Sequence, residues 1–251
     1  MIVVRDCMTT PAQTVPFDAR AVDIMKLLEE RSISAVPVVE DGRLTGIVST
    51  TDLVRTLAGN ADPALRADRV MTAPVVVAAP DEPLDEAARR LVAARVHRLI
   101  VTEGERPVGV LSARDMLTEL FRRRPPAAIR AIMTAPVETV AVGDSVGEAI
   151  VKLASAGVHG LVVVDGTFPV GVFTHAEALA ARHLPETVKR GPVEDAMSYE
   201  TICLDADTPI HRAAAHAMAM NVRRILVVEH RHLVGVLSAI DLVGVLARAP
   251  S

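Results

Sequence analysis

Four heptapeptides in the sequence place a hydroxyl and a carboxylate at the same spacing. They read GIVSTTD from residue 46, GVLSARD from 109, GVFTHAE from 171 and GVLSAID from 235. Ser or Thr followed three residues later by Asp or Glu is the capping-box pattern of a helix start, where it stabilises by about 1 kcal/mol. The same point presents a hydroxyl, a carboxylate and helix N–H groups, which suits ribose and phosphate. The pattern predicts four helix caps and is also compatible with a ligand contact.

The last residue of the heptapeptide favours a role beyond capping. A capping box prefers Glu or Gln at this place. Three copies carry the shorter Asp instead, at Asp52, Asp115 and Asp241, and only Glu177 fits the preference. We interpret the three Asp copies as both helix cap and ligand contact.

Basic residues form a second candidate group where a strand is expected to begin. The second and fourth copies of this region contain VHRLIV and VRRILV, with the basic residues His97, Arg98, Arg223 and Arg224. The same places hold Ser34 and Ala35 in the first copy, and His159 and Gly160 in the third. Guanidinium groups bind phosphate through two parallel hydrogen bonds, so the Arg positions predict phosphate contacts. Salt bridges to neighbouring carboxylates are the alternative.

These groups recur because the chain is built from internal repeats. Met8, Met71, Met133 and Met197 are separated by 63, 62 and 64 residues, and the first Gly of the four heptapeptides follows the same series. The sequence therefore predicts four copies of one unit of about 63 residues.

Each unit is expected to fold as β-α-β-β-α. In the second copy, VVVA precedes a helix with Pro83 in its first turn, RLIVTE and PVGVLS form a hairpin, and a second helix runs from Ser112 to about Leu120. The predicted fold class is mixed α/β (α+β). One unit of this size buries too little apolar surface to be stable alone, so the units should pair. The FRRRPPAA segment at 121–128 breaks the pattern between the second and third units. Its three Arg are interpreted as a solvated helix end, with anion binding as the alternative.

Composition excludes several classes of function. A length of 251 residues favours one or two cores, and the net charge of −4 disfavours nucleic acid as a partner. Cys7 and Cys203 fit neither a metal site nor a disulfide framework, which favours a reducing cytoplasm. No segment reaches about 18 uninterrupted apolar residues, so no membrane span is expected.

The repeats resemble cystathionine-β-synthase (CBS) motifs. MTTP and MTAP at the unit starts, ISAVPVVEDGRLTGIVSTTD and VHRLIVTEGERPVGVLSARD carry the resemblance over about residues 1–249. The chain is similar to proteins with four CBS motifs in two tandem pairs (Bateman modules), such as the gamma subunit of AMP-activated protein kinase and stand-alone microbial proteins. The expected boundaries are 1–61, 62–121, a linker at 122–128, 129–186 and 187–251.

The resemblance implies adenine ligands (AMP, ADP, ATP or S-adenosylmethionine) in clefts between paired motifs. It implies ribose and phosphate contacts from Ser49 and Asp52, Ser112 and Asp115, Ser238 and Asp241, with Thr174 and Glu177 as the departing set. It implies phosphate contacts from His97, Arg98, Arg223, Arg224 and, in the third motif, His159. It implies an adenine pocket near Thr10, Val36, Thr72, Leu99, Thr134 and Tyr199. Tyr199 would stack on a base or fill its cleft, and the Glu177 cleft is expected to be the weakest or empty.

No other constellation predicts chemistry. His211 and His216 are spaced poorly for chelation, Met218 and Met220 are interpreted as core residues, and no metal is expected. Nucleophile and nucleotide-loop motifs of enzymes are not visible, so an enzyme is not expected. The leading hypothesis is a cytoplasmic, nucleotide-binding regulatory protein, either a single chain or a homodimer. The alternatives are a structural or oligomerisation module with empty clefts, and a regulatory subunit of an unidentified enzyme or transporter.

Overall fold

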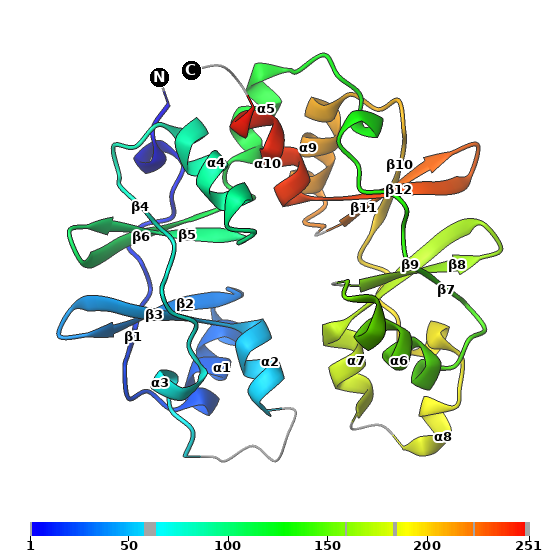
Figure 1. Cartoon of the computed structure of the whole chain (residues 1–251), viewed down its shortest axis with the longest axis horizontal. Helices are drawn as coiled ribbons and strands as arrows, with labels where there is room; N and C mark the ends of the chain where they lie inside the picture. Colours follow the sequence, from blue (N-terminus) through cyan, green and yellow to red (C-terminus); the bar gives the residue numbers. More distant parts are fainter. Residues whose placement is uncertain (1, 58–63, 159, 183–184, 223, 249–251) are drawn as a thin grey trace. The chain divides into compact units, whose positions relative to one another are not determined.

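Two units, each containing two three-stranded sheets, make up the chain (Figure 1). The computed structural model describes residues 2–57, 64–158, 160–182, 185–222 and 224–248. The first unit comprises residues 1–116 and 246–251, and the second comprises residues 117–245. The four sheets with their helices confirm the mixed α/β fold class and the fourfold β-α-β-β-α repeat.

The elements follow the same order in every motif. In the first two motifs they are η1 (Val4–Asp6), β1 (Val15–Pro16), α1 (Ala21–Glu30), β2 (Ala35–Glu40), β3 (Arg43–Ser49), α2 (Thr50–Leu57), α3 (Ala67–Val70), β4 (Val77–Ala78), α4 (Leu84–Ala93), β5 (Arg98–Glu103), β6 (Arg106–Ser112) and α5 (Leu117–Arg123). In the last two they are η2 (Ile129–Ala131), β7 (Thr139–Ala141), α6 (Val146–Ala156), β8 (Gly160–Asp165), β9 (Phe168–Thr174), α7 (His175–Arg182), α8 (Glu186–Lys189), η3 (Val193–Asp195), β10 (Ile202–Asp205), α9 (Ile210–Ala219), β11 (Arg224–Glu229), β12 (His232–Ser238) and α10 (Ala239–Ala247).

Amphipathic patterns explain how the helices cover their sheets. Leu84, Ala87, Ala88 and Leu91 recur on one face of α4 and all four are buried, as the helical period predicts. Arg122 and Arg123 end α5, which confirms that this basic run is a helix end.

Helix α5 departs from the sequence prediction. It begins at Leu117 rather than directly after Ser112, because residues 113–116 form turns. A backbone hydrogen bond from Asp115 N to Ser112 O, at 3.1 Å, closes this turn. The helix then packs against α9 within the second unit.

The two motifs of a pair exchange their opening segments. Thr72 of the second motif forms an antiparallel bridge with Ile47 of β3, and Thr9 of the first motif forms the same bridge with Val110 of β6. In the second unit, Thr134 pairs with Val236, and Ser198 pairs with Val172. The exchange is reciprocal, so each pair has an approximate twofold relation between its motifs.

A methionine lies over a heptapeptide glycine at each exchange. A Cβ added to Gly109 would come within 2.6 Å of Met8 Sδ, and one added to Gly171 within 2.8 Å of Met197 Sδ. Gly46 and Gly235 meet Met71 and Met133 in the same way. The common spacing of Met and Gly in the sequence therefore reflects a contact between the two motifs of a pair.

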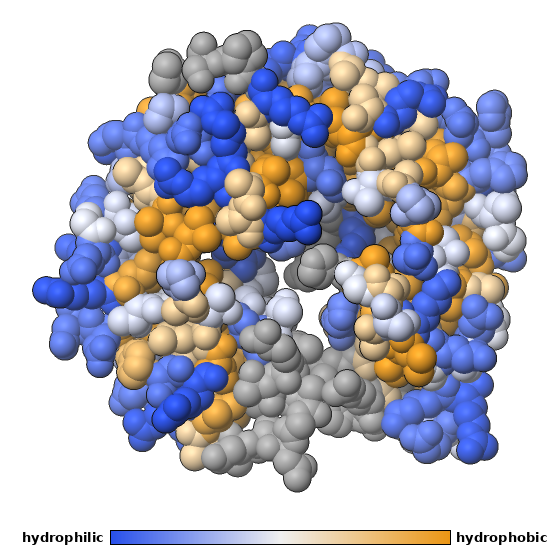
Figure 2. Space-filling view, viewed as in Figure 1, coloured by the Kyte–Doolittle hydropathy of each residue, from blue (hydrophilic) through white to orange (hydrophobic). Residues whose placement is uncertain are grey.

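The hairpin tips of paired motifs also meet. In the first unit, Leu44 N donates to Glu105 O at 2.9 Å, and Arg43 forms an ion pair with Glu105 at 3.2 Å. In the second unit, Leu233 N donates to Thr167 O at 3.0 Å. Figure 2 shows hydrophilic side chains over the tips of the β2–β3 and β5–β6 hairpins. The two hairpin tips of a pair thus contact each other through polar, solvated groups, whereas the hydrophobic cores lie beneath the helices.

Candidate functional site

Each heptapeptide forms the hydrogen bonds of a capping box, which cap α2, α7 and α10, whereas those of the second heptapeptide close the turn that precedes α5. The backbone N–H of its Ser or Thr donates to the carboxylate three residues later, at 2.8 Å for Asp52, 2.7 Å for Asp115, 2.7 Å for Asp241 and 2.9 Å for Glu177. The hydroxyl donates to the same carboxylate oxygen in all four copies. We call these four Ser/Thr and Asp/Glu sets boxes 1 to 4, in chain order. In all four boxes the carboxylate accepts a backbone hydrogen bond at the point where a strand ends.

Box 1 takes a further contact from the other motif of its pair. Thr72 Oγ1 donates to Asp52 Oδ1 at 3.1 Å, while Asp52 Oδ2 accepts the hydrogen bonds of the cap. The Ile47–Thr72 bridge places Thr72 there, and the Asp52 side chain is buried at 7% exposure. Asp52 and Thr72, to which the family resemblance gives the ribose and adenine sides of a ligand site, are therefore in direct contact.

The predicted phosphate residue Arg98 also crosses between motifs. Its Nη2 donates to Ser34 Oγ at 2.6 Å, and Ser34 O accepts from Thr50 N at the start of α2, at 3.0 Å. The backbone of Arg98 pairs with Ser112 of box 2. The guanidinium therefore lies near box 1 although its strand runs beside box 2.

Arg224 has the corresponding position in the second unit. A Cβ added to Gly160 would lie 3.5 Å from Cζ and Nη2 of Arg224 and 3.1 Å from Cγ2 of Thr174, which belongs to box 3. The backbone of Arg224 pairs with Ser238 of box 4. His97 is exposed, whereas the predicted phosphate residues His159 and Arg223 lie outside the described residues.

The predicted adenine residues fall into two groups. Val36 and Leu99 are fully buried at 0% exposure, so their side chains belong to the core beneath the strands. Thr10 is exposed and its Oγ1 donates to Val108 O at 3.1 Å, and Thr134 bonds through its backbone to Val236. Val36 and Leu99 can therefore shape a cleft only through their backbone atoms.

Tyr199 lines a surface depression of about 260 Å³. The depression also contains Met220 and Val222, and Tyr199 and Met220 are 64% and 57% exposed. The expectation that Met220 is a core residue is wrong, because α9 ends at Ala219 and turns Met220 outward. An exposed ring beside a thioether offers an apolar platform. No pattern in the sequence marks Met220 as exposed, because the point at which α9 ends decides which way the side chain after it lies.

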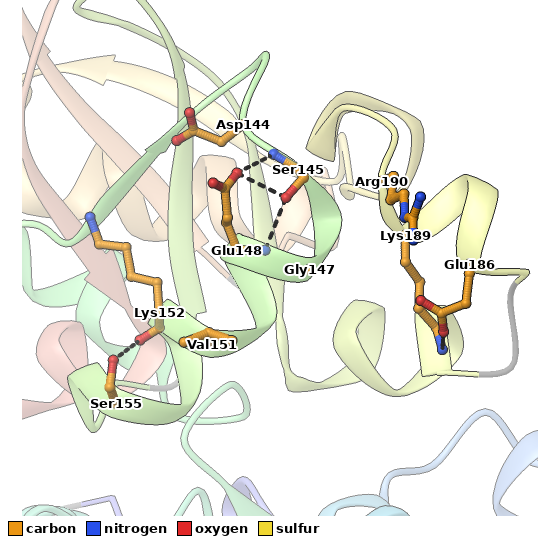
Figure 3. A pocket seen from close by; sticks show the side chains of 10 residues that line it. All are labelled: Asp144, Ser145, Gly147, Glu148, Val151, Lys152, Ser155, Glu186, Lys189 and Arg190. Atoms are coloured by element: carbon orange, nitrogen blue, oxygen red, sulfur yellow. Dashed lines mark hydrogen bonds and ion pairs between the residues drawn. The ribbon is translucent and has the colours of Figure 1, made fainter.

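A larger depression of about 860 Å³ lies on the surface of α6 and α8 (Figure 3). Ser145 and Glu148 form a capping box there, and hydrogen bonds from Ser145 lower the pKa of Glu148 below its usual range. Lys189 donates to Glu186 at 2.8 Å, which lowers the pKa of Glu186. Lys152 also donates to Thr139 O at 2.6 Å, so most charged side chains of this open surface already have partners. Its lining comes from α6, α8 and adjacent turns, separate from the four boxes.

Among the described residues, no group of three or more His, Cys, Asp or Glu side chains could hold a metal ion. None of the helices in those residues is long and apolar enough to cross a membrane.

Comparisons with known proteins agree with this architecture. The CBS domain family model matches residues 4–59, 67–122, 129–183 and 193–248. A Thermofilum pendens relative, an uncharacterised 33.4 kDa protein in the ribosomal RNA operon, is 29% identical over 171 residues, covering 62% of this chain and 57% of its own length. The chain thus spans little more than half of that curated relative.

Two solved structures have the same fold over nearly the whole chain. A Methanocaldococcus jannaschii protein, described as a candidate archaeal homologue of g-AMPK, aligns with a TM-score of 0.82 at 15% identity, covering 98% of this chain and 100% of that one. An uncharacterised conserved protein from Pyrococcus horikoshii aligns with a TM-score of 0.73 at 21% identity, with the same coverage. At such identities the likeness concerns the fold alone.

Proposed function

Because the chain belongs to the CBS domain family, we propose that it is a non-enzymatic regulatory protein that binds adenine nucleotides between paired motifs. The observation that carries the proposal is the composite site of the first pair. There the carboxylate of Asp52 meets Thr72 of the other motif, and Arg98 of that same motif reaches Ser34 beside box 1. A hydroxyl and a carboxylate for ribose, with a guanidinium for phosphate, are what a nucleotide requires.

The roles follow from the chemistry of each side chain. We assign ribose contacts to the carboxylates of the boxes, and phosphate contacts to Arg98 and Arg224. The guanidinium groups favour AMP, ADP or ATP over S-adenosylmethionine, because the sulfonium of the latter is positively charged and lacks a phosphate. Tyr199 and Met220 would supply an apolar surface for a base.

Because box 1 contacts both motifs of its pair, its structure also suggests how the binding of a nucleotide could affect the rest of the protein. Box 1 takes groups from two motifs, so a bound nucleotide would join the opening segment of one motif to the helix start of the other. A ligand changes an equilibrium only through differential affinity for its states. Occupancy would then change the packing within a pair or the affinity for a partner. We propose the cytoplasm as its location, and a second copy of the chain or an unidentified regulated enzyme or transporter as its partner.

The boxes differ in how readily their carboxylates could contact ribose. In box 1 both oxygens of Asp52 already accept hydrogen bonds, so a ribose hydroxyl must displace Thr72 or share the oxygen with it. Glu177 in box 3 is longer than Asp by one methylene group. We therefore propose boxes 2 and 4 as the stronger ribose sites and retain the Glu177 cleft as the weakest.

A structural module is the second candidate, and one observation favours it. Every box carboxylate accepts two hydrogen bonds from its own Ser or Thr, so each box has a complete role without any ligand. If the chain is a structural module, the clefts between paired motifs bind no ligand and only hold the motifs together.

Asp115→Glu separates the two candidates. Glu keeps the hydrogen bonds from Ser112 that close the turn before α5, so the free energy of unfolding should change by less than about 1 kcal/mol. The longer side chain displaces the ribose-facing oxygen, so calorimetry should show AMP or ATP affinity reduced roughly tenfold, equivalent to about 1.4 kcal/mol. Unchanged affinity in this variant would exclude the ribose role.

The capping box of α6 provides a matched control. Glu148 accepts from Ser145 N and Oγ at 2.9 and 2.8 Å, as the box carboxylates do, but it lies on the open surface of Figure 3. Glu148→Asp should leave nucleotide affinity unchanged. A thermal-shift screen of AMP, ADP, ATP and S-adenosylmethionine on the wild type tests the premise, since a ligand of the native state raises stability. No shift and no calorimetric signal at millimolar concentration would leave the structural module as the function.

A further inference from the structure

Four of the nine methionines in the chain occupy one structural position. Each lies in the opening segment of a motif and packs over the first glycine of the heptapeptide of the other motif in its pair. A Cβ added to Gly109 would lie 2.6 Å from Met8 Sδ, and one added to Gly171 would lie 2.8 Å from Met197 Sδ. The thioether sulfur therefore fills the space directly above the glycine backbone.

A sulfoxide oxygen does not fit at such a contact. Hydrogen peroxide transfers one oxygen atom to a methionine sulfur and leaves as water, so that an apolar thioether becomes a larger, polar sulfoxide. A Cβ added to Gly46 would meet Met71 Cγ at 2.8 Å and Met71 Cβ at 3.0 Å as well as the sulfur, so this side chain lies along the glycine. Overpacking is relieved by shifts of the backbone. Oxidation should therefore push the opening segment away from the hairpin strand of the other motif.

A displacement of Met71 would also disturb box 1. Thr72, the next residue, exchanges two backbone hydrogen bonds with Ile47, at 2.9 and 3.1 Å, and its Oγ1 donates to Asp52 at 3.1 Å. All three hydrogen bonds require the opening segment to lie against β3. Oxidation of one sulfur would thus release the carboxylate of box 1 from its contact with the other motif.

The four methionines differ in their access to solvent. Met8, Met71 and Met133 are partly exposed, whereas Met197 is buried at 9% exposure. A small oxidant reaches a partly exposed side chain more readily than a buried one. The first pair therefore has two oxidisable contacts, and the second pair has one.

From this geometry we propose that Met8, Met71 and Met133, the switch methionines, make the motif pairs sensitive to peroxide. Their oxidation to sulfoxide separates the opening segments from the other motif, and their reduction joins the two again. Methionine sulfoxide reductases return the oxygen to water while two thiols of the reductant become a disulfide. This switch acts on the packing within a pair and needs no nucleotide.

Limited oxidation of the full chain with hydrogen peroxide tests the switch. Peptide mass spectrometry should find sulfoxide at the switch methionines, and the melting temperature should fall by about 5 °C. Hydrogen exchange at the amides of Ile47 and Thr72 should become roughly tenfold faster. Treatment with reductases for both sulfoxide epimers should restore both values. Dithiothreitol, added after the peroxide, reverses the disulfide and sulfenic forms of Cys7 and Cys203 but not methionine sulfoxide, so the cysteines do not contribute.

Two exposed methionines provide the matched control. Met25 and Met220 are 37% and 57% exposed, and the four heptapeptide glycines contact other methionines, so oxidation of these two should leave the melting temperature unchanged. Met25→Leu with Met220→Leu should retain the full response. Leu at all three switch methionines should abolish it, because Leu has a similar volume but no sulfur. If that triple variant does not fold, Met71→Leu alone should abolish the faster exchange at Thr72.

Three results would overturn the proposal. In the first, the switch methionines stay unoxidised at a peroxide dose that fully oxidises Met25 and Met220. In the second, they are oxidised but the melting temperature and the hydrogen exchange do not change, so the contact accommodates a sulfoxide. In the third, the loss of stability persists after the reductases have removed the sulfoxide, so the oxidation is damage and not a switch.

Discussion

Gly171→Ala should destabilise the second unit, because no space exists for a methyl group at this position. A Cβ there would lie 2.8 Å from the backbone oxygen of Ser198 and 2.8 Å from Met197 Sδ. The Ser198 oxygen cannot move freely, since it accepts from Val172 N at 3.0 Å and Ser198 N donates to Val172 O at 2.8 Å. Relief of the clash must therefore separate the exchanged segment from β9.

The expected cost combines overpacking with a weakened pair of hydrogen bonds. Overpacking costs typically 1–3 kcal/mol, and each hydrogen bond contributes roughly 1 kcal/mol. We expect the free energy of unfolding to fall by about 2–3 kcal/mol, which lowers the melting temperature by roughly 5–10 °C for a chain of this size. Thermal melts followed by circular dichroism measure this shift directly.

Two further variants make the measurement specific. Gly143→Ala is the matched control, since a Cβ there meets nothing within 4 Å, and it should leave stability unchanged or slightly raised. Met197→Ala added to Gly171→Ala should restore little, because the Ser198 oxygen stays in place. A melting temperature of Gly171→Ala within about 1 °C of the wild type would refute the close-approach reasoning.

Three other substitutions test single contacts. Ser145→Ala removes the hydroxyl cap of α6 and should lower the free energy of unfolding by about 1 kcal/mol in urea melts. Thr72→Val keeps the side-chain shape but removes the hydrogen bond to buried Asp52, so a loss of about 1–3 kcal/mol is expected, and no loss would mean that water satisfies this oxygen. The hydrogen bond from Arg130 lowers the pKa of Asp207 below its ordinary 3.8. The folded state therefore binds this proton less readily, and the contribution of Asp207 is present above about pH 4 and lost as pH falls through the lowered pKa. Asp207→Asn should make low-salt stability less dependent on pH below about 4, by a small amount because the pair is exposed.

Local features of the fold follow directly from the sequence. The capping boxes are an example, since Ser49 and Asp52 are three residues apart and meet wherever a helix begins there. The 63-residue register of Met and Gly predicts four equivalent units for the same reason. One local prediction failed: α5 begins five residues later than the Ser112 pattern indicated, because the turn at 113–116 intervenes before the helix.

Contacts between motifs could be identified only from the tertiary structure. The repeat shows that Met71 and Gly46 are recurring positions, but not that Met71 of one motif lies over Gly46 of the other. The same holds for Asp52 with Thr72, which are 20 residues apart, and for Arg98 with Ser34, which are 64 apart.

The sequence by itself determined the fourfold β-α-β-β-α repeat, the helix caps and the residue types that suit a nucleotide. All of these depend on spacings of a few residues or on a period along the chain. Only the tertiary structure decided which motif completes which box and that the Arg98 guanidinium of the second motif lies beside box 1 of the first. The physical reason is the reciprocal exchange of opening segments. This exchange brings together residues that are far apart in the chain, through the packing of two similar sheets. Because the four repeats are similar, the sequence is compatible with several pairings of motifs, and only the packed cores select one of them.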